Sequence, residues 1–432
     1  MTSSSDGPNR GDRGTRGNFG EGRSAGSAVS SGLQGEGFLA RSFPPKPVAF
    51  VRGAGHELFT ADGTAYTDLG GASHGVANFG HGHPRIVEAI RRQSGELIHD
   101  TMTIPSPVRA EFLDKLHALL PQQLERTFLA NSGTEAVECA LKHAATATGR
   151  HKFIALRNSF HGRTLGALAA TFRPQYRNPF HDLLIDVDFV APGDEAALEL
   201  AATEETAAIL VEPVQGEGGL AVMPDAFLRA CERVAHAQGA LLVVDEIQTG
   251  LGRTGTDLAI TPSGAKPDLL LLGKSLAGGL PIGTCSMTAD VAAKMPAGGH
   301  GNTFGGSPLV CAAASAALDV LREEHLAERA RIEGGRLAQR LAQLASPLVR
   351  EVRGKGLMLG VELRIKSRPV LDALLRRRLL ALAAGPTVVR MLPPLATPRA
   401  VLDKAVDALG EVLSDPRLAP QPSTASGAVE VA

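Results

Sequence analysis

The chain has 432 residues, of which 44 are Lys or Arg and 45 are Asp or Glu, so its formal net charge is -1. This balance argues against a general nucleic-acid-binding protein, which is usually strongly basic. No stretch offers the roughly 18 consecutive apolar residues of a membrane helix, and no apolar signal-peptide core follows the first residues. We therefore expect a cytoplasmic globular protein that binds neither nucleic acid nor membrane.

The sequence predicts a tail at each end of the chain and alternating strands and helices between the two tails. Residues 1–36 are rich in Gly, Ser and Arg, and residues 416–432 are rich in Pro, Ser and Ala, so both are predicted to be disordered. Between them, short runs that are apolar on both faces predict buried strands. These runs are Lys152–Leu156, Ala207–Val211, Ala240–Val244 and Asp268–Leu272, and helical patterns such as Thr134–Thr148 and Pro224–Gln238 separate them. Such alternation predicts an α/β fold with a mainly parallel sheet.

A smaller α+β domain is expected after a long helical stretch that starts near Ser307. Strand patterns follow at 349–352, 357–363 and 387–392, and the last helix is expected near 398–413. Strand and turn signals in Phe38–Asp68 suggest that this segment joins the same small domain. The predicted boundaries are 37–75 and 323–415 for the small domain and 76–322 for the large one.

The four cysteines, Cys139, Cys231, Cys285 and Cys311, form no C-x-x-C pair and lie in apolar sequence. This pattern is typical of buried thiols in a reducing compartment. We expect neither a disulfide nor a metal site.

Gly250–Gly255 matches G-x-G-x-x-G and follows a predicted strand. A dinucleotide site also needs a helix to open there and an acidic residue about 20 residues later. Pro262, Gly264 and Pro267 would break such a helix, and the nearest later acid, Asp268, begins the next strand. We therefore reject the dinucleotide interpretation.

Two short motifs could hold the phosphate and the ring of a cofactor. Asn131-Ser132-Gly133-Thr134 lies at a strand-to-helix turn, where free N–H groups and the helix dipole suit a phosphate. An ordinary helix N-cap at Ser132 also explains this motif. In Phe160-His161-Gly162-Arg163, the aromatic ring could stack on a flat ligand, and Arg163 could clamp a carboxylate.

Two further motifs place charged groups at the carboxyl ends of buried strands. Asp245 needs a cationic partner when buried, which a protonated ring nitrogen or a salt bridge within the protein would supply. Lys274 follows Gly273 at a strand end and is either a Schiff-base lysine or a surface lysine. Together the four motifs supply a phosphate cradle, a stacking ring, a pyridinium partner and a Schiff-base lysine, which are the parts that a pyridoxal phosphate enzyme needs.

Longer stretches carry a family resemblance. They are NSGTEA, FHGRTLGALAAT, VEPVQGEGG, VVDEIQTGLGRTG, LLLGKSLAGGLPIG, GGHGNTFGGSPL and VRGKGLMLGVEL, in this order between residues 38 and 413. The sequence resembles the class III aminotransferases of pyridoxal-phosphate fold type I. It is most similar to the acetylornithine aminotransferase group, with its relative that acts on carrier-bound aminoadipate semialdehyde in lysine biosynthesis. The resemblance implies an aspartate-aminotransferase-like fold with a seven-stranded sheet in the large domain, pyridoxal 5'-phosphate as cofactor, and a homodimer.

The resemblance also implies which residues bind the cofactor. Lys274 would form the Schiff base and shuttle the proton, and Asp245 would keep the ring nitrogen protonated. Gln248 would face the ring hydroxyl, and Phe160 would stack on the ring. The phosphate would be bound by Ser132, Gly133 and Thr134.

The resemblance also gives roles to four more residues. Thr303 would reach the phosphate of the neighbouring subunit. Arg390 would bind the α-carboxylate of glutamate, and Arg163 would hold the other carboxylate. Glu217 would pair with Arg390 whenever no α-carboxylate is present.

The implied reaction is a ping-pong transfer of an amino group between glutamate or 2-oxoglutarate and a terminal aldehyde. Relatives that act on free ornithine are expected to carry an early Tyr, which Gly71–Asn78 does not contain. The stretches GVANFGHGHP, IPSPVRAEF and AGPTVVRMLPPL look most like the lysine-pathway relative. We expect aminoadipate semialdehyde on a small acidic carrier protein (LysW) as substrate, with N-acetylornithine of arginine biosynthesis, or one enzyme that serves both pathways, as the alternative. A same-fold aminomutase, a non-catalytic cofactor-binding regulator and a structural α/β protein are the remaining hypotheses.

Overall fold

The computed structural model describes residues 34–40, 42 and 45–418. Most of both predicted tails lies outside these residues; within them, Gln34–Phe38 and Pro416–Leu418 form short 3-10 helices. By their contacts, Met1–Phe50 and Val51–Ala432 are two separate units, and the elements below belong to the second. The domain boundaries expected after residues 75 and 322 stay a prediction.

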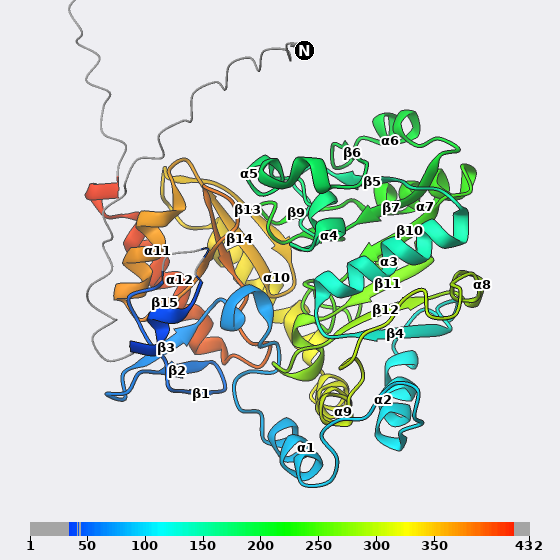
Figure 1. The fold of residues 1–432 in the computed structure, drawn as a ribbon. Helices are drawn as coiled ribbons and strands as arrows, with labels where there is room; N and C mark the ends of the chain where they lie inside the picture. The colour runs from blue at the N-terminus through cyan, green and yellow to red at the C-terminus, as the bar shows by residue number, and fades with distance from the viewer. Residues whose placement is uncertain (1–33, 41, 43–44, 419–432) are drawn as a thin grey trace, which may run out of the picture. The chain divides into compact units, whose positions relative to one another are not determined.

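The largest sheet has seven strands in the order β4-β12-β11-β10-β7-β5-β6 (Figure 1). Its strands are β4 (Arg126–Ala130), β5 (Lys152–Leu156), β6 (Val187–Val190), β7 (Thr206–Val211), β10 (Leu241–Asp245), β11 (Leu269–Leu272) and β12 (Gly283–Met287). The four predicted strands are confirmed to within one residue at each end. Strand β12 runs antiparallel to both of its neighbours, and the remaining neighbours pair in parallel. The seven-stranded, mainly parallel sheet is therefore confirmed.

Both faces of this sheet are buried. On β7, Ala208 and Leu210 belong to the core that contains α3 (Gly133–Thr148), whereas Ile209 and Val211 belong to the core that contains α7 (Asp225–Ala237) and α9 (Pro308–Glu323). Two covered faces explain why these strands are apolar at every position. Each core also contains two of the four cysteines, all of which are buried as expected.

The remaining strands form smaller sheets. One combines β1 (Arg52–Ala54), β2 (Glu57–Phe59), β3 (Ala65–Asp68) and β15 (Leu379–Leu380), and another combines β13 (Val349–Lys355), β14 (Met358–Leu363), β17 (Val388–Met391) and β16 (Leu382–Ala383). A short hairpin pairs β8 (Val214–Gln215) with β9 (Ala221–Val222). Because β15 pairs in parallel with β3, the N-terminal strands share a sheet with the C-terminal region.

The other helices are α1 (Pro84–Ser94), α2 (Pro107–His117), α4 (Leu165–Ala169), α5 (Pro174–Arg177), α6 (Glu195–Ala201), α8 (Ala289–Ala293), α10 (Leu326–Ala342), α11 (Ser367–Arg376) and α12 (Arg399–Leu413). The helices α1, α2, α5 and α9 each begin at a proline, whose fixed φ and missing N–H suit a first helical position. The long helical pattern after Ser307 is two helices, which separate at His325 with φ of 51°. In the described part of the chain, no helix is both long and apolar enough to span a membrane.

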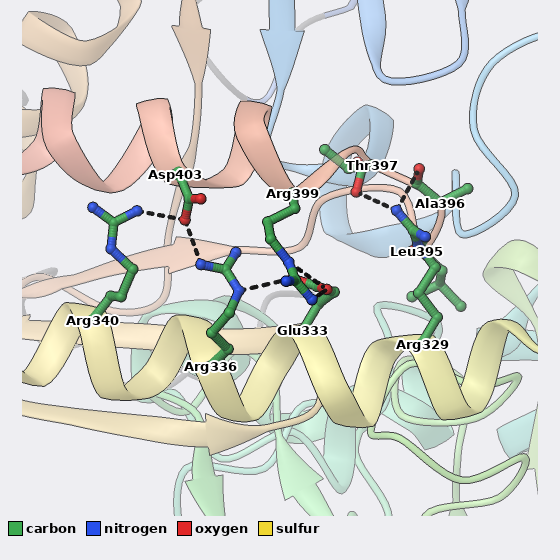
Figure 2. Close-up of polar contacts among 9 residues, drawn as sticks. All are labelled: Arg329, Glu333, Arg336, Arg340, Leu395, Ala396, Thr397, Arg399 and Asp403. Atoms are coloured by element: carbon green, nitrogen blue, oxygen red, sulfur yellow. Dashed lines mark hydrogen bonds and ion pairs between the residues drawn. The ribbon is translucent and has the colours of Figure 1, made fainter.

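Ion pairs fasten α12 to α10 (Figure 2). Glu333 of α10 binds Arg399 at 2.6 Å and Arg336 at 2.9 Å, and Arg336 also reaches Asp403 at 2.5 Å. Arg340 forms a second ion pair with Asp403. These links hold the C-terminal helix against the rest of the unit.

The glycine-rich loop Gly250–Gly255 opens no helix, which agrees with the rejection of a dinucleotide site. It carries Arg253, whose side chain is fully buried. Its guanidinium donates to the carbonyl oxygens of Leu357 at 2.9 Å and Pro393 at 2.7 Å and to Oδ1 of Asn78 at 2.6 Å. Burial lowers the pKa of Arg253 to about 9. The loop therefore links the end of β10 to the C-terminal strands.

Candidate active site

A cavity of about 270 Å³ lies at the carboxyl ends of the central strands, where open α/β sheets bind ligands. Its lining includes eight of the predicted site residues, namely Gly133, Thr134, Phe160, Arg163, Glu217, Asp245, Gln248 and Lys274. Of the other predicted residues, Ser132 and Arg390 are next to the lining, and Thr303 is exposed outside it. The structure therefore brings together most of the residues that the sequence singled out.

The N-terminus of α3 forms one wall. Ser132 is the N-cap, and its hydroxyl accepts a hydrogen bond from the N–H of Glu135 at 3.3 Å, so the ordinary capping role is present. Gly133 lines the cavity, and a Cβ there would lie 2.9 Å from the side chain of Ile247. Packing against Ile247 therefore accounts for the glycine, while the free N–H groups of the helix N-terminus suit a phosphate.

Asp245 is buried at the end of β10. Its Oδ1 accepts from the N–H of Ile247 at 3.0 Å, and its Oδ2 lies 2.7 Å from Nδ1 of buried His161. Burial opposes the charge on His161, but the hydrogen bond and the charge of Asp245 outweigh it and raise its pKa. A salt bridge within the protein, the alternative left open above, is therefore present, while Asp245 still lines the cavity.

Two titratable residues of the lining, His161 and Glu212, received no role from the sequence. Besides holding Asp245, His161 has a buried Nε2 with no hydrogen-bond partner among the described residues. Glu212 accepts from the N–H of Phe160 at 2.9 Å and of Gly216 at 3.3 Å, and burial raises its pKa to about 7. Glu212 directly follows β7, so the strand-end rule that drew attention to Asp245 would also have found it.

Lys274 directly follows Gly273 at the end of β11 and lines the cavity. Burial lowers the pKa of its amine, and the charge of Arg390 lowers it further, although Glu217 and Asp245 act in the opposite direction. Its φ of 44° lies in the left-handed region, a strain that usually persists only where the surrounding structure enforces it, as at active sites. A lowered pKa favours the neutral form of a lysine amine, which is the nucleophilic form.

Arg390 of β17 is fully buried behind Glu217. Its Nη1 donates to Oε1 of Glu217 at 2.5 Å, to the carbonyl of Gly216 at 2.7 Å and to Oε1 of Gln248 at 3.2 Å. Its Nε and Nη2 have no partner in the described part of the chain. Burial raises the pKa of Glu217, but the charges of Arg390, His74 and Lys274 and the hydrogen bond from Arg390 together outweigh burial and lower the pKa. The pair expected between Glu217 and Arg390 is therefore present.

Arg163 and Phe160 lie on another wall. The guanidinium carbon of Arg163 lies 3.5 Å from the ring centroid of Tyr176 and 5.6 Å from that of Phe160. Such stacking holds an exposed arginine in place beside the cavity. Thr303 does not contribute to this wall, and its contact with a neighbouring subunit stays a prediction.

The arrangement fits pyridoxal phosphate. Gly133 and Thr134 offer a helix N-terminus for a phosphate, and Phe160 offers a flat apolar ring. Asp245 offers a carboxylate for a protonated nitrogen, and Lys274 offers an amine whose pKa is lowered. Each group required by this cofactor thus has a candidate partner around one cavity.

Comparison with known proteins decides the family. The family model described as aminotransferase class-III matches residues 38–413. The chain belongs to the class-III aminotransferases. It is 46% identical to the [LysW]-aminoadipate semialdehyde transaminase of Deinococcus radiodurans, over 85% of this chain and 86% of the relative. It is 42% identical to the acetylornithine aminotransferase of Methanopyrus kandleri, over 85% and 94%.

Solved structures give the same result. The ornithine aminotransferase of Toxoplasma gondii, described with pyridoxal phosphate at its active site, superposes with a TM-score of 0.83 at 32% identity, over 87% of this chain and 91% of that one. This class-III aminotransferase has the predicted fold and is a pyridoxal-phosphate-dependent transaminase.

Proposed function

We propose that this aminotransferase moves an amino group between glutamate and the aldehyde end of aminoadipate semialdehyde held on a LysW-type carrier protein. Relatives named for that substrate are 46% identical to this chain in Deinococcus radiodurans and 41% identical in Sulfurisphaera tokodaii. The lack of a Tyr within Gly71–Asn78 further supports an N-blocked or carrier-linked amine. The enzyme would work in the cytoplasm as a homodimer in which Thr303 completes the partner's phosphate site.

One alternative substrate has specific support. Acetylornithine aminotransferases from Methanopyrus kandleri and Methanothermobacter thermautotrophicus are 42% and 39% identical to this chain. N-acetylornithine has the same blocked α-amine and free terminal amine as the carrier-linked substrate. The same site would therefore accept it, with Arg163 binding its carboxylate.

The observation that carries the proposal is that only one of the three guanidinium nitrogens of Arg390 has hydrogen-bond partners among the described residues. Its Nη1 is bound to Glu217, while its buried Nε and Nη2 find no partner among the described residues. Unpaired buried donors on a cation are costly unless a ligand satisfies them. A carboxylate fits these two donors in a bidentate manner. We infer that the α-carboxylate of glutamate binds there, and that Glu217 covers the cation when the substrate brings only a terminal amine.

The chemistry at the reacting atoms follows from the surrounding side chains. When bound, pyridoxal phosphate supplies an aldehyde that condenses with amines and a ring that accepts electrons. Asp245, positioned by His161, would hold a proton at the ring nitrogen, and this charge stabilises electrons delivered to the ring. Lys274 would take the proton from the substrate carbon and deliver it to another atom, a role that the lowered pKa of its buried amine favours.

Half-reactions of the purified holoenzyme test the proposal. Glutamate is expected to bleach the visible absorption that the cofactor acquires on joining Lys274, and carrier-linked lysine is expected to do the same. Bleaching by N-acetylornithine but not by carrier-linked lysine would favour arginine biosynthesis. Absence of bleaching by glutamate would contradict a glutamate transaminase and favour an aminomutase.

The K274A variant tests the reacting lysine. Turnover is expected to fall at least about a thousandfold, because both the nucleophile and the proton carrier are removed. K266A changes an exposed lysine outside the cavity and serves as the matched control. An active K274A enzyme with normal absorption would contradict the assignment.

A further inference from the structure

Glu217 has a second possible partner at the cavity. The Oε1 atom that binds Arg390 at 2.5 Å also lies 3.7 Å from Nε2 of His74. One carboxylate oxygen thus lies between a permanent cation and a titratable one. The His74 side chain is 47% exposed and that of Glu217 21%, so protons can reach this pair from solvent.

The backbone holds His74 in an unusual position. Gly71–Gly75 forms a single π-helical turn, in which Ser73 and His74 have φ of 77° and 62°. Left-handed conformations at two consecutive residues with side chains cost energy and persist where the surrounding structure enforces them. Leu392, two residues after Arg390, donates to the carbonyl of Leu69 at 2.6 Å, so the chain leading into this turn is tied to the strand that carries Arg390.

A local hydrogen bond selects which ring nitrogen faces Glu217. The hydroxyl of Ser73 lies 2.5 Å from Nδ1 of His74, which leaves Nε2 for the carboxylate. The charged groups that act on His74 are Glu217, Arg390 on β17 and Lys274 after β11. Burial is the largest influence and lowers the pKa of His74, Arg390 and Lys274 lower it further, and Glu217 opposes them.

We propose that His74 is a specificity-determining residue that receives the carboxylate of Glu217 when a dicarboxylate takes Arg390. The inference rests on the proposed function, in which glutamate is the dicarboxylate. A carboxylate on Nε and Nη2 of Arg390 would place a second anion on the guanidinium whose Nη1 binds Glu217, and repulsion between the two anions would oppose glutamate binding unless Glu217 has another cationic partner. His74 supplies that partner, because its Nε2 already lies 3.7 Å from the same oxygen of Glu217.

The proposal predicts proton uptake on binding. In the unliganded enzyme, Glu217 pairs with Arg390, and His74 has a lowered pKa and is mostly neutral near pH 7.5. Once the dicarboxylate occupies Arg390, Glu217 faces His74 and favours its protonated form. A group that gains affinity for protons on binding makes that binding tighter as the pH falls. Dicarboxylates should therefore bind more tightly at pH 6 than at pH 8.

Calorimetry of glutarate binding to the holoenzyme tests this without turnover. Titrations in two buffers with different ionisation enthalpies give the number of protons taken up. The wild-type enzyme is expected to take up a fraction of a proton for each glutarate bound. It should also bind glutarate about fivefold more tightly at pH 6 than at pH 8, a modest effect because the ion pair is partly exposed. Binding without proton uptake would overturn the proposal, whereas absence of glutarate binding together with inertness toward glutamate would overturn the proposed function instead.

Variants of His74 and Glu217 separate a specific role from a structural one. H74N keeps a residue type that tolerates the left-handed region, and it should lose both proton uptake and the preference for pH 6. E217Q should lose proton uptake with His74 still in place, and H74K should keep tight binding at both pH values. H181N, at an exposed histidine outside the cavity, is the matched control and should behave as wild type. Retention of proton uptake by H74N would contradict the proposal.

Discussion

Arg253 and Arg390 are both fully buried, yet their surroundings differ. The guanidinium of Arg253 donates from Nε, Nη1 and Nη2 to two carbonyl oxygens and to Asn78. That of Arg390 uses only Nη1, and its Nε and Nη2 have no partner in the described structure. Burial is the same in both, so burial alone does not distinguish a structural arginine from one that binds a ligand.

The difference lies in which donors the protein itself satisfies. A buried cation whose donors are all used holds segments together, because each lost bond would leave a buried acceptor unpaired. A buried cation with unsatisfied donors beside a cavity is destabilised until a carboxylate ligand binds those donors. The comparison predicts that replacing the first arginine affects folding and that replacing the second affects substrate binding.

The largest effect on stability is expected from R253M. Methionine fills much of the volume but leaves Asn78 and the carbonyls of Leu357 and Pro393 without their donor, at about 3–5 kcal/mol in total. Denaturant unfolding of the holoenzyme measures this loss. If R253M were as stable as the wild type, the structural role of this arginine would be wrong.

A smaller effect, on catalysis rather than folding, is expected from R390M. The second-order rate constant for glutamate should fall about a hundredfold or more, because a buried charged hydrogen-bond partner of the substrate is worth about 2–5 kcal/mol. Half-reaction kinetics with glutamate and with N-acetylornithine measure the difference, and the rate constant for N-acetylornithine should fall far less than that for glutamate. If both rate constants fell equally, Arg390 would not bind glutamate specifically, and the distinction from the structural Arg253 would be wrong.

The smallest effect is expected from R399M, which removes an exposed arginine from the α10–α12 ion pairs (Figure 2). Glu333 keeps Arg336 as a partner, and exposed pairs contribute little. The thermal midpoint should fall by less than about 2 °C, and by less still in high salt. If R399M lost as much free energy of unfolding as R253M, the exposure of an arginine would not set the size of its contribution to stability.

The sequence predicted the central strands and the chemistry of their ends closely. Lys152–Leu156 and its neighbours are apolar on both faces, and only a sheet covered on both sides accommodates such runs. Asp245 and Lys274 follow two of these strands, and adjacent strands place their ends side by side at one edge. Strand β12 was not predicted, because its residues Gly283–Met287 include Thr284 and Ser286, which look like a loop until they pair with β11 and β4.

By itself, therefore, the sequence determined the family, the sheet and the short-range motifs, because these depend on local pattern and on spacing along the chain. The pairing of Glu217 with Arg390 came from the family resemblance, whereas the pairing of His161 with Asp245 was found only in the tertiary structure. The contact between His161 and Asp245 spans 84 positions, and that between Arg390 and Glu217 spans 173. No local pattern encodes such pairs, since packing of distant segments fixes both the distance and the burial that give these charges their effect.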